Sequence, residues 1–265
     1  MTAPPPSLAI LFLPACIGAA VNLAETRRAQ HDAGALLARH VAAALTGRAP
    51  ESVVWARDGL LCKPRAELSS RPGGAIASLN LSYAQGLAVC AFQCEVSHRT
   101  GVDVITLSRA ARAAPSAASL LGGIICEPFD DGMGDSYMTE GFSPEHFATR
   151  WTMLEAVLKL GGLGLSLEGA ARSVMAEVRV VPLSHSEAQC LRIFTCPADA
   201  PGSLNHRIAA FASISIQSDL GSAVTRRLIA RFESARASWQ AITFAIELVG
   251  HEPIIASLAW DCSEL

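Results

Sequence analysis

The chain has 265 residues, of which 51% are hydrophobic and 17% are charged. This composition is typical of a folded globular protein and excludes an intrinsically disordered one, and the length suffices for one large domain or two smaller ones. The net charge of -3 gives no general attraction to nucleic acid or to an anionic membrane, so an anionic ligand must be met by local charges.

The N-terminal segment "PPPSLAILFLPACIGAAVNLAETRR" is apolar, but it lacks the features of a signal peptide. No basic residue precedes the apolar run, Pro14 interrupts it, and Arg27 and Arg28 follow it. The run is also too short to span a bilayer, so we expect an opening strand in "LAILFLP". The cysteines form no C-x-x-C pair and no zinc-like spacing, which favours buried free thiols and a cytoplasmic location.

Helical and strand-like patterns follow one another up to residue 109. Apolar residues at helical spacing predict a helix over residues 29–47 that ends at Gly47, followed by an irregular stretch to about Gly74. The run "AIASLNLSYAQGLAVCAFQCEV" predicts two strands joined by a turn at residues 84–86. "TGVDVITLSR" predicts another short strand, with an acidic residue in its middle.

The strongest helical pattern in the chain is "FSPEHFATRWTMLEAVLKLGG". Ser143 suits the N-cap, Pro144 suits the first helical position, and Gly161 suits the end. A loop rich in Asp and Gly precedes this helix at residues 129–141, and a shorter helix is expected to begin near Ser166.

The C-terminal part of the chain is predicted to consist mainly of strands. The strand patterns are "AEVRVVPL", "CLRIFTC", "RIAAFASISIQ", "WQAITFAIELV" and "PIIASLAW", whereas "SAVTRRLIARFESARASW" is more helical. The order of elements predicts an α+β fold with two similar halves, each an antiparallel sheet packed against a helix. No Walker, G-x-G-x-x-G or G-x-S-x-G pattern occurs.

A charged pair stands out in the apolar helix before Gly161. Trp151, Glu155 and Lys159 are spaced i, i+4 and i+8, and therefore share one stripe of the helix. One interpretation is an exposed ion pair, which stabilises a helix by about 0.2–0.5 kcal/mol. The other is a functional site, because a carboxylate in apolar surroundings is costly to desolvate unless a cation meets it.

Asp103 is the second unusual residue, because it interrupts the β-branched strand pattern "GVDVI". It is either a carboxylate bonded to backbone at a strand edge or turn, or part of a site. If Asp103 and Glu155 converge, they provide two hard oxygen ligands, which suit Mg²⁺ completed by water and substrate phosphate. Lys159 would then face the phosphate as a point charge.

These residues lie in motifs that resemble the surfactin-type 4'-phosphopantetheinyl transferase superfamily. "GVDV", "FSPEHF" and "WTMLEAVLKLGGLGL" are similar, in order, to the family's G-[IV]-D-[IV]-E, F-[ST]-x-x-E and W-x-x-K-E-A-x-x-K-x-x-G-x-G. Upstream, "CKPRAEL" resembles its G-K-P segment and "LNLSYAQGLAVCAF" its F-N-[IL]-S-H-S strand pair, while "GHEPIIASLAW" resembles its closing strand. The likeness covers about residues 60–165 well.

The resemblance implies an α+β fold of two pseudo-symmetric halves, residues 1–100 and 101–265, each an antiparallel sheet packed against a long helix, with a ligand cleft between them. It implies Mg²⁺-dependent transfer of 4'-phosphopantetheine from coenzyme A to a serine of an apo acyl or peptidyl carrier protein, with release of 3',5'-ADP. The residues that it implicates are Asp103 and Glu155 for the metal, Glu155 and Lys159 for catalysis, and Lys63, Pro64, Ser82, Tyr83 and Lys159 for coenzyme A.

The chain departs from the family pattern at three positions. Ile105 stands where the family has a third carboxylate, Tyr83 replaces a histidine, and Leu154 replaces a lysine. Two of these changes remove groups that could bind the anionic part of coenzyme A. The residues considered as replacements for the lost charge are His31, Arg39, His40 and Arg99.

The resemblance also implies a partner, because carrier proteins present an acidic helix near the modified serine. The basic side chains considered for its docking are Arg27, Arg28, Arg226, Arg227 and Arg231, which are otherwise expected to be solvated. The loop over residues 129–141 is a candidate lid. The alternatives are a coenzyme A-binding relative that has lost turnover and a non-enzymatic interaction protein, and pseudo-symmetry within one chain favours a monomer.

Overall fold

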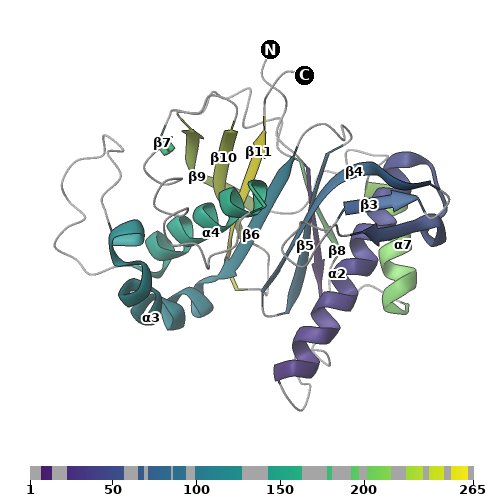
Figure 1. Cartoon of the computed structure of the whole chain (residues 1–265). Coiled ribbons are helices and arrows are strands. Elements are labelled where there is room, and N and C mark those ends of the chain that lie inside the picture. Colours follow the sequence, from purple (N-terminus) through teal and green to yellow (C-terminus); the bar gives the residue numbers. More distant parts are fainter. Residues whose placement is uncertain are drawn as a thin grey trace. The chain divides into compact units, whose positions relative to one another are not determined.

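Two groups of elements make up the part of the chain that the structure describes (Figure 1). The computed structural model describes residues 7–13, 23–56, 65–68, 71–84, 86–93, 99–126, 143–162, 178–180, 192–196, 202–215, 225–234, 239–247 and 252–261. The expected lid at residues 129–141, the short helix near Ser166, and Lys63 and Pro64 lie outside these residues.

The chain divides into two compact units, and each is described by itself. The α2 unit comprises Pro6–Thr100 and Leu191–Ala223, and the α4 unit comprises Met1–Pro5, Gly101–Cys190 and Val224–Leu265. Each unit contains one sheet and two of the described helices, so the α+β class is confirmed. The expected boundary after residue 100 separates the units, but Leu191–Ala223 groups with the N-terminal half.

A six-stranded sheet forms the centre of the α2 unit. Its strands, in spatial order, are β2 (Val53–Ala56), β3 (Arg65–Leu68), β4 (Arg71–Ala84), β5 (Leu87–Gln93), β1 (Ser7–Phe12) and β8 (Ile193–Cys196). The predicted hairpin is confirmed, because β4 and β5 pair antiparallel around Gly86, whose φ is 77°. A φ in this region favours glycine, since a Cβ would be strained there.

The sheet of the α2 unit is mixed rather than antiparallel throughout, which corrects our expectation. β1 pairs antiparallel with β5, but it pairs parallel with β8, where Leu8 lies opposite Ile193. The two parallel strands are far apart in the sequence, so no hairpin turn constrains their direction. Pairing between such distant segments leaves no local signal in the sequence.

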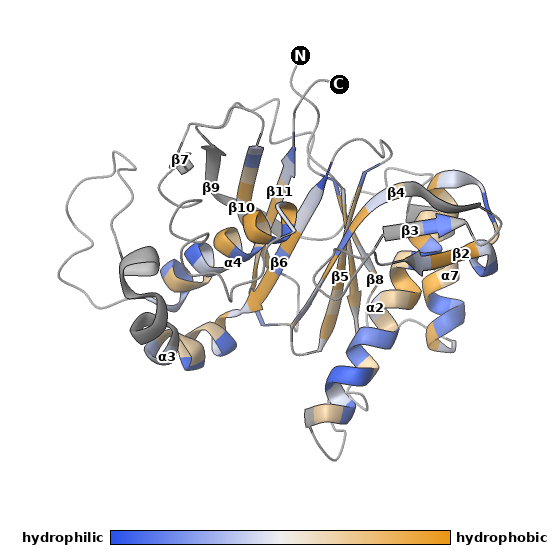
Figure 2. Ribbon diagram, in the orientation of Figure 1, coloured by the Kyte–Doolittle hydropathy of each residue, from blue (hydrophilic) through white to orange (hydrophobic). Residues whose placement is uncertain are grey.

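Two helices accompany this sheet. Helix α2 (Leu23–Thr46) contacts β4, β5 and helix α7 (Leu204–Ser215). Its first turns are mainly polar, whereas its buried residues, such as Leu37 and Val41, belong to the core of the unit (Figure 2). The helix ends at Gly47, whose φ of 64° confirms the predicted end. Pro50–Ser52 then forms a short 3₁₀ turn before β2.

A five-stranded sheet forms the centre of the α4 unit. The strands, in spatial order, are β6 (Thr100–Thr106), β11 (Ile254–Asp261), β10 (Trp239–Glu247), β9 (Thr225–Ser234) and β7 (Val178–Val180). The strands β11, β10, β9 and β7 pair antiparallel in turn. Every residue of β6 is buried, and so are Ile254–Trp260 of β11, so the sheet is well covered at this end.

Helix α4 (Pro144–Leu160) packs on β11, β10 and helix α3 (Leu107–Cys126). Its predicted start is confirmed, because the Ser143 hydroxyl accepts a hydrogen bond from the His146 N–H at 3.1 Å and Pro144 begins the helix. Helix α3 was not predicted. The Glu252 carboxylate accepts hydrogen bonds from the backbone N–H and the hydroxyl of Ser108, which stabilises the start of α3.

Three segments differ from the sequence-based prediction. The run expected to be a strand around "RIAAFASIS" is helix α7, because Ile208, Phe211 and Ala212 are buried at helical spacing. The run expected to be more helical contains strand β9, which is held by antiparallel pairing with β10. The stretch expected to be irregular before Gly74 contains β2 and β3, and β4 begins within it.

Candidate functional site

The stripe Trp151–Glu155–Lys159 is the accessible side of helix α4. From Phe147 to Leu160 these three residues are half-buried, and every other residue is buried. Trp151 stacks on Phe147 with ring centroids 5.6 Å apart, so the head of the stripe is packed against the helix itself. The stripe predicted from the sequence therefore exists, and it leaves Glu155 and Lys159 able to meet a ligand or solvent.

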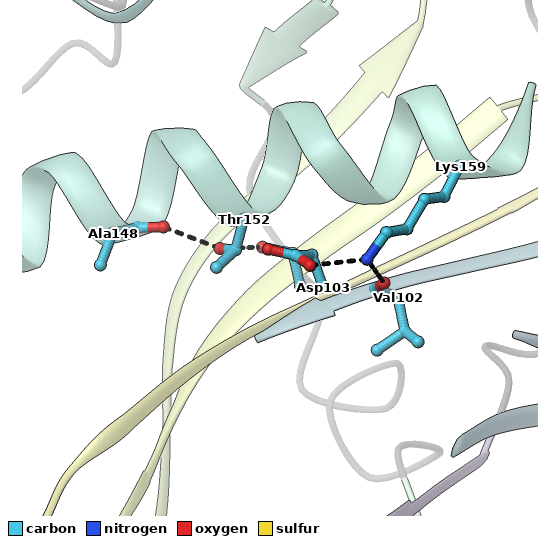
Figure 3. Close-up of polar contacts among 6 residues, drawn as sticks. Val102, Asp103, Ala148, Thr152 and Lys159 are labelled. Carbon is cyan, nitrogen blue, oxygen red and sulfur yellow. Dashed lines mark hydrogen bonds and ion pairs between the residues drawn. The ribbon is translucent and has the colours of Figure 1, made fainter. Parts of the chain in front are cut away.

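Asp103 lies in the middle of β6, where it is 7% exposed. The Lys159 ammonium donates to Asp103 Oδ1 at 2.7 Å and to the Val102 carbonyl at 3.0 Å (Figure 3). Burying a carboxylate is costly without a partner, and this ammonium is one that the structure provides. Residues that lie 56 positions apart in the sequence thus meet across a helix and a strand.

The close approach of β6 to α4 depends on Gly101. A Cβ placed on Gly101 would lie 2.0 Å from the Ala156 carbonyl oxygen and 2.8 Å from the Leu160 nitrogen, both in the helix backbone. Only glycine fits at such a distance, so Gly101 allows β6 to pass directly beside the backbone of α4. This contact brings the backbone of Val102 and the Asp103 side chain within reach of Lys159.

Buried hydroxyl groups connect α4 to the sheet. Thr152 Oγ1 donates to the Ala148 carbonyl at 2.8 Å and lies 2.7 Å from Ser257 Oγ on β11, which lies 2.6 Å from Thr243 Oγ1 on β10. Because a carbonyl oxygen can only accept, Ser257 donates to Thr152 and Thr243 donates to Ser257. We call this arrangement the hydroxyl chain. All three hydroxyl-bearing residues are fully buried.

The pKa of Glu155 is raised from its usual 4.5 to about 7. Burial of the carboxyl group is the main cause, and the negative charge of Asp103 adds to it. The positive charges of Lys159 and Arg109 act in the opposite direction. Asp103 and Glu155 are therefore close enough for their charges to interact, and Glu155 titrates near neutral pH, where a general acid or base is most effective.

This raised pKa predicts a pH dependence of stability. Between pH 4.5 and about 7 the folded protein retains a proton on Glu155 that the unfolded chain has released. The free energy of unfolding therefore falls as pH rises through this range, and the contribution of Glu155 is fully lost above about pH 7. Glu155→Gln should remove that loss and be the more stable protein at pH 8, with little difference near pH 4.5. Urea unfolding of both proteins across this range measures the effect, and a pH-independent difference would contradict the raised pKa.

Two of the departures from the family pattern lie in one apolar cluster. Ile105 and Leu154 are both buried and belong to the cluster that also contains Phe147 and Leu158. Neither apolar side chain can hold a metal ion or bind an anion, so the candidate site depends on Asp103, Glu155 and Lys159.

The remaining predicted residues belong to the α2 unit. Ser82 on β4 is buried, and Tyr83 is half-buried with its ring centroid 4.4 Å from that of His31. A Cβ on Gly34 would lie 2.3 Å from the Tyr83 ring, so the ring packs directly on the backbone of α2. Gln30 of the same helix donates to the Ala84 carbonyl at 2.7 Å, which fixes α2 to the end of β4.

Several basic residues considered from the sequence are placed by the structure. His40 Nε2 lies 3.1 Å from the side-chain oxygen of Asn205 on α7, so it links two helices. Arg39 is half-buried on α2, Arg99 is exposed, and Arg27 and Arg28 are exposed on the first turns of α2. Three further arginines lie on β9, where their side chains are outside the described part: Arg226, Arg227 and Arg231.

Arg109 is the residue near the site that sequence reasoning missed. It is exposed near the start of α3, and its charge acts on Glu155. The amphipathic run "LSRAARAA" directly after the strand was the signal that could have indicated a helix here. A helix at this place begins directly after β6, the strand that carries Asp103.

The two carboxylates, Asp103 and Glu155, suit a hard divalent cation, but they provide few protein ligands. Among the described residues, no group of three or more His, Cys, Asp or Glu side chains gathers in a way that could hold a metal ion. Asp103 and Glu155 are two carboxylates, and Mg²⁺ is commonly bound by one or two carboxylates, with water and substrate phosphate completing its shell. The pair therefore fits Mg²⁺ better than a metal that needs several protein ligands.

Comparison with known proteins does not add a family. No protein-family model matches this sequence, and no curated protein matches it significantly. In the part of the chain that the structure describes, none of the helices is long and apolar enough to cross a membrane.

Proposed function

We propose that this protein is a Mg²⁺-dependent 4'-phosphopantetheinyl transferase that acts on an apo acyl or peptidyl carrier protein. The observation that supports the proposal most is the meeting of Asp103, Glu155 and Lys159 on one side of α4, with an ion pair of 2.7 Å between Lys159 and Asp103. These are the residues in which the motifs of the sequence resemble that family. Their interaction across a helix and a strand favours a functional site over a surface ion pair.

The proposed reaction is a phosphoryl-type transfer, in which positioning and charge neutralisation do most of the catalysis. The carrier serine oxygen bonds to the phosphorus that bears pantetheine, and the bond from that phosphorus to the bridging oxygen of coenzyme A breaks, releasing 3',5'-ADP. Mg²⁺, held by Asp103 and Glu155, would neutralise charge on the diphosphate. Lys159 is suited to meet the same anion, and the Glu155 carboxylate is suited to accept the serine proton, directly or through a water molecule.

The proposal extends to the α2 unit and to the partner. It gives Lys63, Pro64, Ser82 and Tyr83 a role in binding coenzyme A in a cleft between two pseudo-symmetric halves. A sheet packed against one long helix in each unit, α2 or α4, supports the idea of two similar halves. The exposed Arg27 and Arg28 remain candidates to contact an acidic carrier helix, and a cytoplasmic monomer remains our prediction.

A transfer assay tests the proposal. With coenzyme A, Mg²⁺ and an apo carrier protein, we expect the carrier to gain the mass of one phosphopantetheine group, which intact-protein mass spectrometry measures. Omission of Mg²⁺ and a carrier whose acceptor serine is replaced by alanine are the controls. No mass gain with fatty-acid, polyketide and nonribosomal-peptide carriers would contradict a transferase function.

The second candidate function is binding of coenzyme A without turnover. It is favoured by the loss of two anion-binding groups, because Tyr83 has a neutral phenol and Leu154 is buried in an apolar cluster. A protein of this kind should gain thermal stability from coenzyme A, since a ligand that binds only the folded state stabilises it, and should leave the carrier mass unchanged. An interaction protein should show neither response.

A further inference from the structure

The Lys159 ammonium is hydrogen-bonded to a carboxylate oxygen that a metal ion would need as a ligand. Its ammonium lies 2.7 Å from Asp103 Oδ1, and the side chains of Lys159 and Asp103 are only 28% and 10% exposed. Solvent therefore screens this pair less than a surface ion pair. A second contact, from the ammonium to the Val102 carbonyl at 3.0 Å, holds the lysine against β6.

The charges around this ammonium favour exchange for a divalent cation. Two carboxylates, Asp103 and Glu155, interact with one another, and Lys159 supplies the positive charge in contact with Asp103, whereas the exposed Arg109 acts on Glu155 more weakly than Lys159 does. A divalent ion would match the two carboxylates more closely. It would also repel an ammonium bound to the same carboxylate, because like charges a few ångströms apart interact strongly in a partly buried place.

We propose that Lys159 is a built-in counter-ion of the Asp103–Glu155 pair, which leaves Asp103 when a divalent cation binds and is thereby released toward the anionic ligand. This inference rests on the metal site of the proposed function. It gives Lys159 two positions, of which the structure shows the one against Asp103 (Figure 3). Metal binding and the availability of the lysine for an anion are then coupled.

The location of Lys159 allows this exchange without movement of the backbone. It lies in the last turn of α4 on the half-buried stripe, and its flexible four-carbon stem can carry the ammonium away from β6. Asp103, by contrast, is held in the middle of a fully buried strand. The lysine is therefore the member of the pair that moves.

The test measures binding of Mn²⁺, an oxygen-preferring stand-in for Mg²⁺, by electron paramagnetic resonance without coenzyme A. Lys159→Met should bind Mn²⁺ roughly tenfold more tightly than the wild type, because the competing ammonium is gone. Lys159→Arg, which keeps a cation, should remain weak. Arg112→Met is the matched control: it removes one positive charge from an exposed position on α3 of the same unit and should change the affinity little.

Thermal unfolding provides a second measurement that shows whether each variant is folded. MgCl₂ should raise the melting temperature of Lys159→Met more than that of the wild type, since the variant has two carboxylates that lack this counter-ion. Unchanged or weaker Mn²⁺ binding by folded Lys159→Met would overturn the counter-ion role. An equal gain in Arg112→Met would overturn it as well, because the effect would then be one of net charge.

The transfer assay, run on the wild-type protein, separates this inference from the proposed function. Transfer together with unchanged Mn²⁺ affinity in Lys159→Met would overturn the counter-ion role and leave the transferase function intact. Tighter Mn²⁺ binding by Lys159→Met without transfer by the wild type would support the counter-ion role and count against the transferase. If neither the wild type nor any variant binds Mn²⁺, the metal assignment and the counter-ion role both fail.

Discussion

Replacement of Glu155 by glutamine is expected to reduce phosphopantetheine transfer by roughly 10²–10⁴-fold, the contribution typical of a general acid or base. The amide keeps the size of the side chain, but it removes a metal ligand and a proton acceptor at once. Because the group is half-buried on the stripe of α4 and no longer has to carry a charge, the fold should be retained. The rate of carrier modification and the melting temperature at pH 8 measure the two effects.

A matched control comes from Glu247, which is exposed at the end of β10 in the same unit. Glu247→Gln makes the same chemical change away from the stripe and should leave transfer within about twofold of the wild type, since such surface changes cost little. Full activity of Glu155→Gln would refute the metal and base assignments together. Equal losses in both variants would point instead to a general effect of charge.

Replacement of Gly101 by alanine is expected to destabilise the protein by about 3 kcal/mol, at the upper end of the costs of over-packing. The added methyl group would lie 2.0 Å from the Ala156 carbonyl oxygen, and a helix backbone cannot yield as a flexible side chain does. Helix α4 would have to move away from β6, which would separate Lys159 from Asp103. Urea unfolding measures the stability, and Mn²⁺ affinity reports on the site.

Gly47 provides the comparison for this variant. Its φ is 64°, and a Cβ there would meet nothing within 4 Å, so Gly47→Ala tests backbone strain without a steric clash. We expect a cost of about 1–2 kcal/mol and unchanged Mn²⁺ affinity. If Gly101→Ala were no more harmful than Gly47→Ala, the close approach of strand and helix would not be the feature that positions the site.

Three residues of the candidate site, Asp103, Glu155 and Lys159, could be singled out from the sequence because their signals are local. The spacing of Glu155 and Lys159 places them on one stripe, and the caps of α4 fix the phase of that helix. Asp103 was noticed because an acid is unusual among β-branched residues. The ion pair between Asp103 and Lys159 was not foreseen, because it depends on how closely the strand passes the helix at Gly101.

The fold was predicted less evenly, and the errors have a common cause. Strand β9 contains "TRRLIARFE", whose clustered arginines also fit a helix surface, and its pairing with β10 decides the outcome. Helix α7 is short and contains Ile208, Phe211 and Ile214, residues that also favour strands, and its packing against α2 decides in the other direction. The parallel pairing of β1 with β8 joins segments that no local pattern could connect.

The hydroxyl chain has a consequence for the accuracy with which α4 presents its side chains. A helix packed only through apolar side chains can rotate or slide slightly, because apolar contacts have no preferred direction. A hydrogen bond, by contrast, has a preferred angle and a short range. Rotation of α4 by one residue, about 100°, would remove the Thr152 hydroxyl from Ser257 and leave buried groups without partners. The hydrogen bonds to the sheet therefore fix the rotation of α4 about its own axis. The directions in which Glu155 and Lys159 point thus depend on three buried neutral residues, Thr152, Thr243 and Ser257.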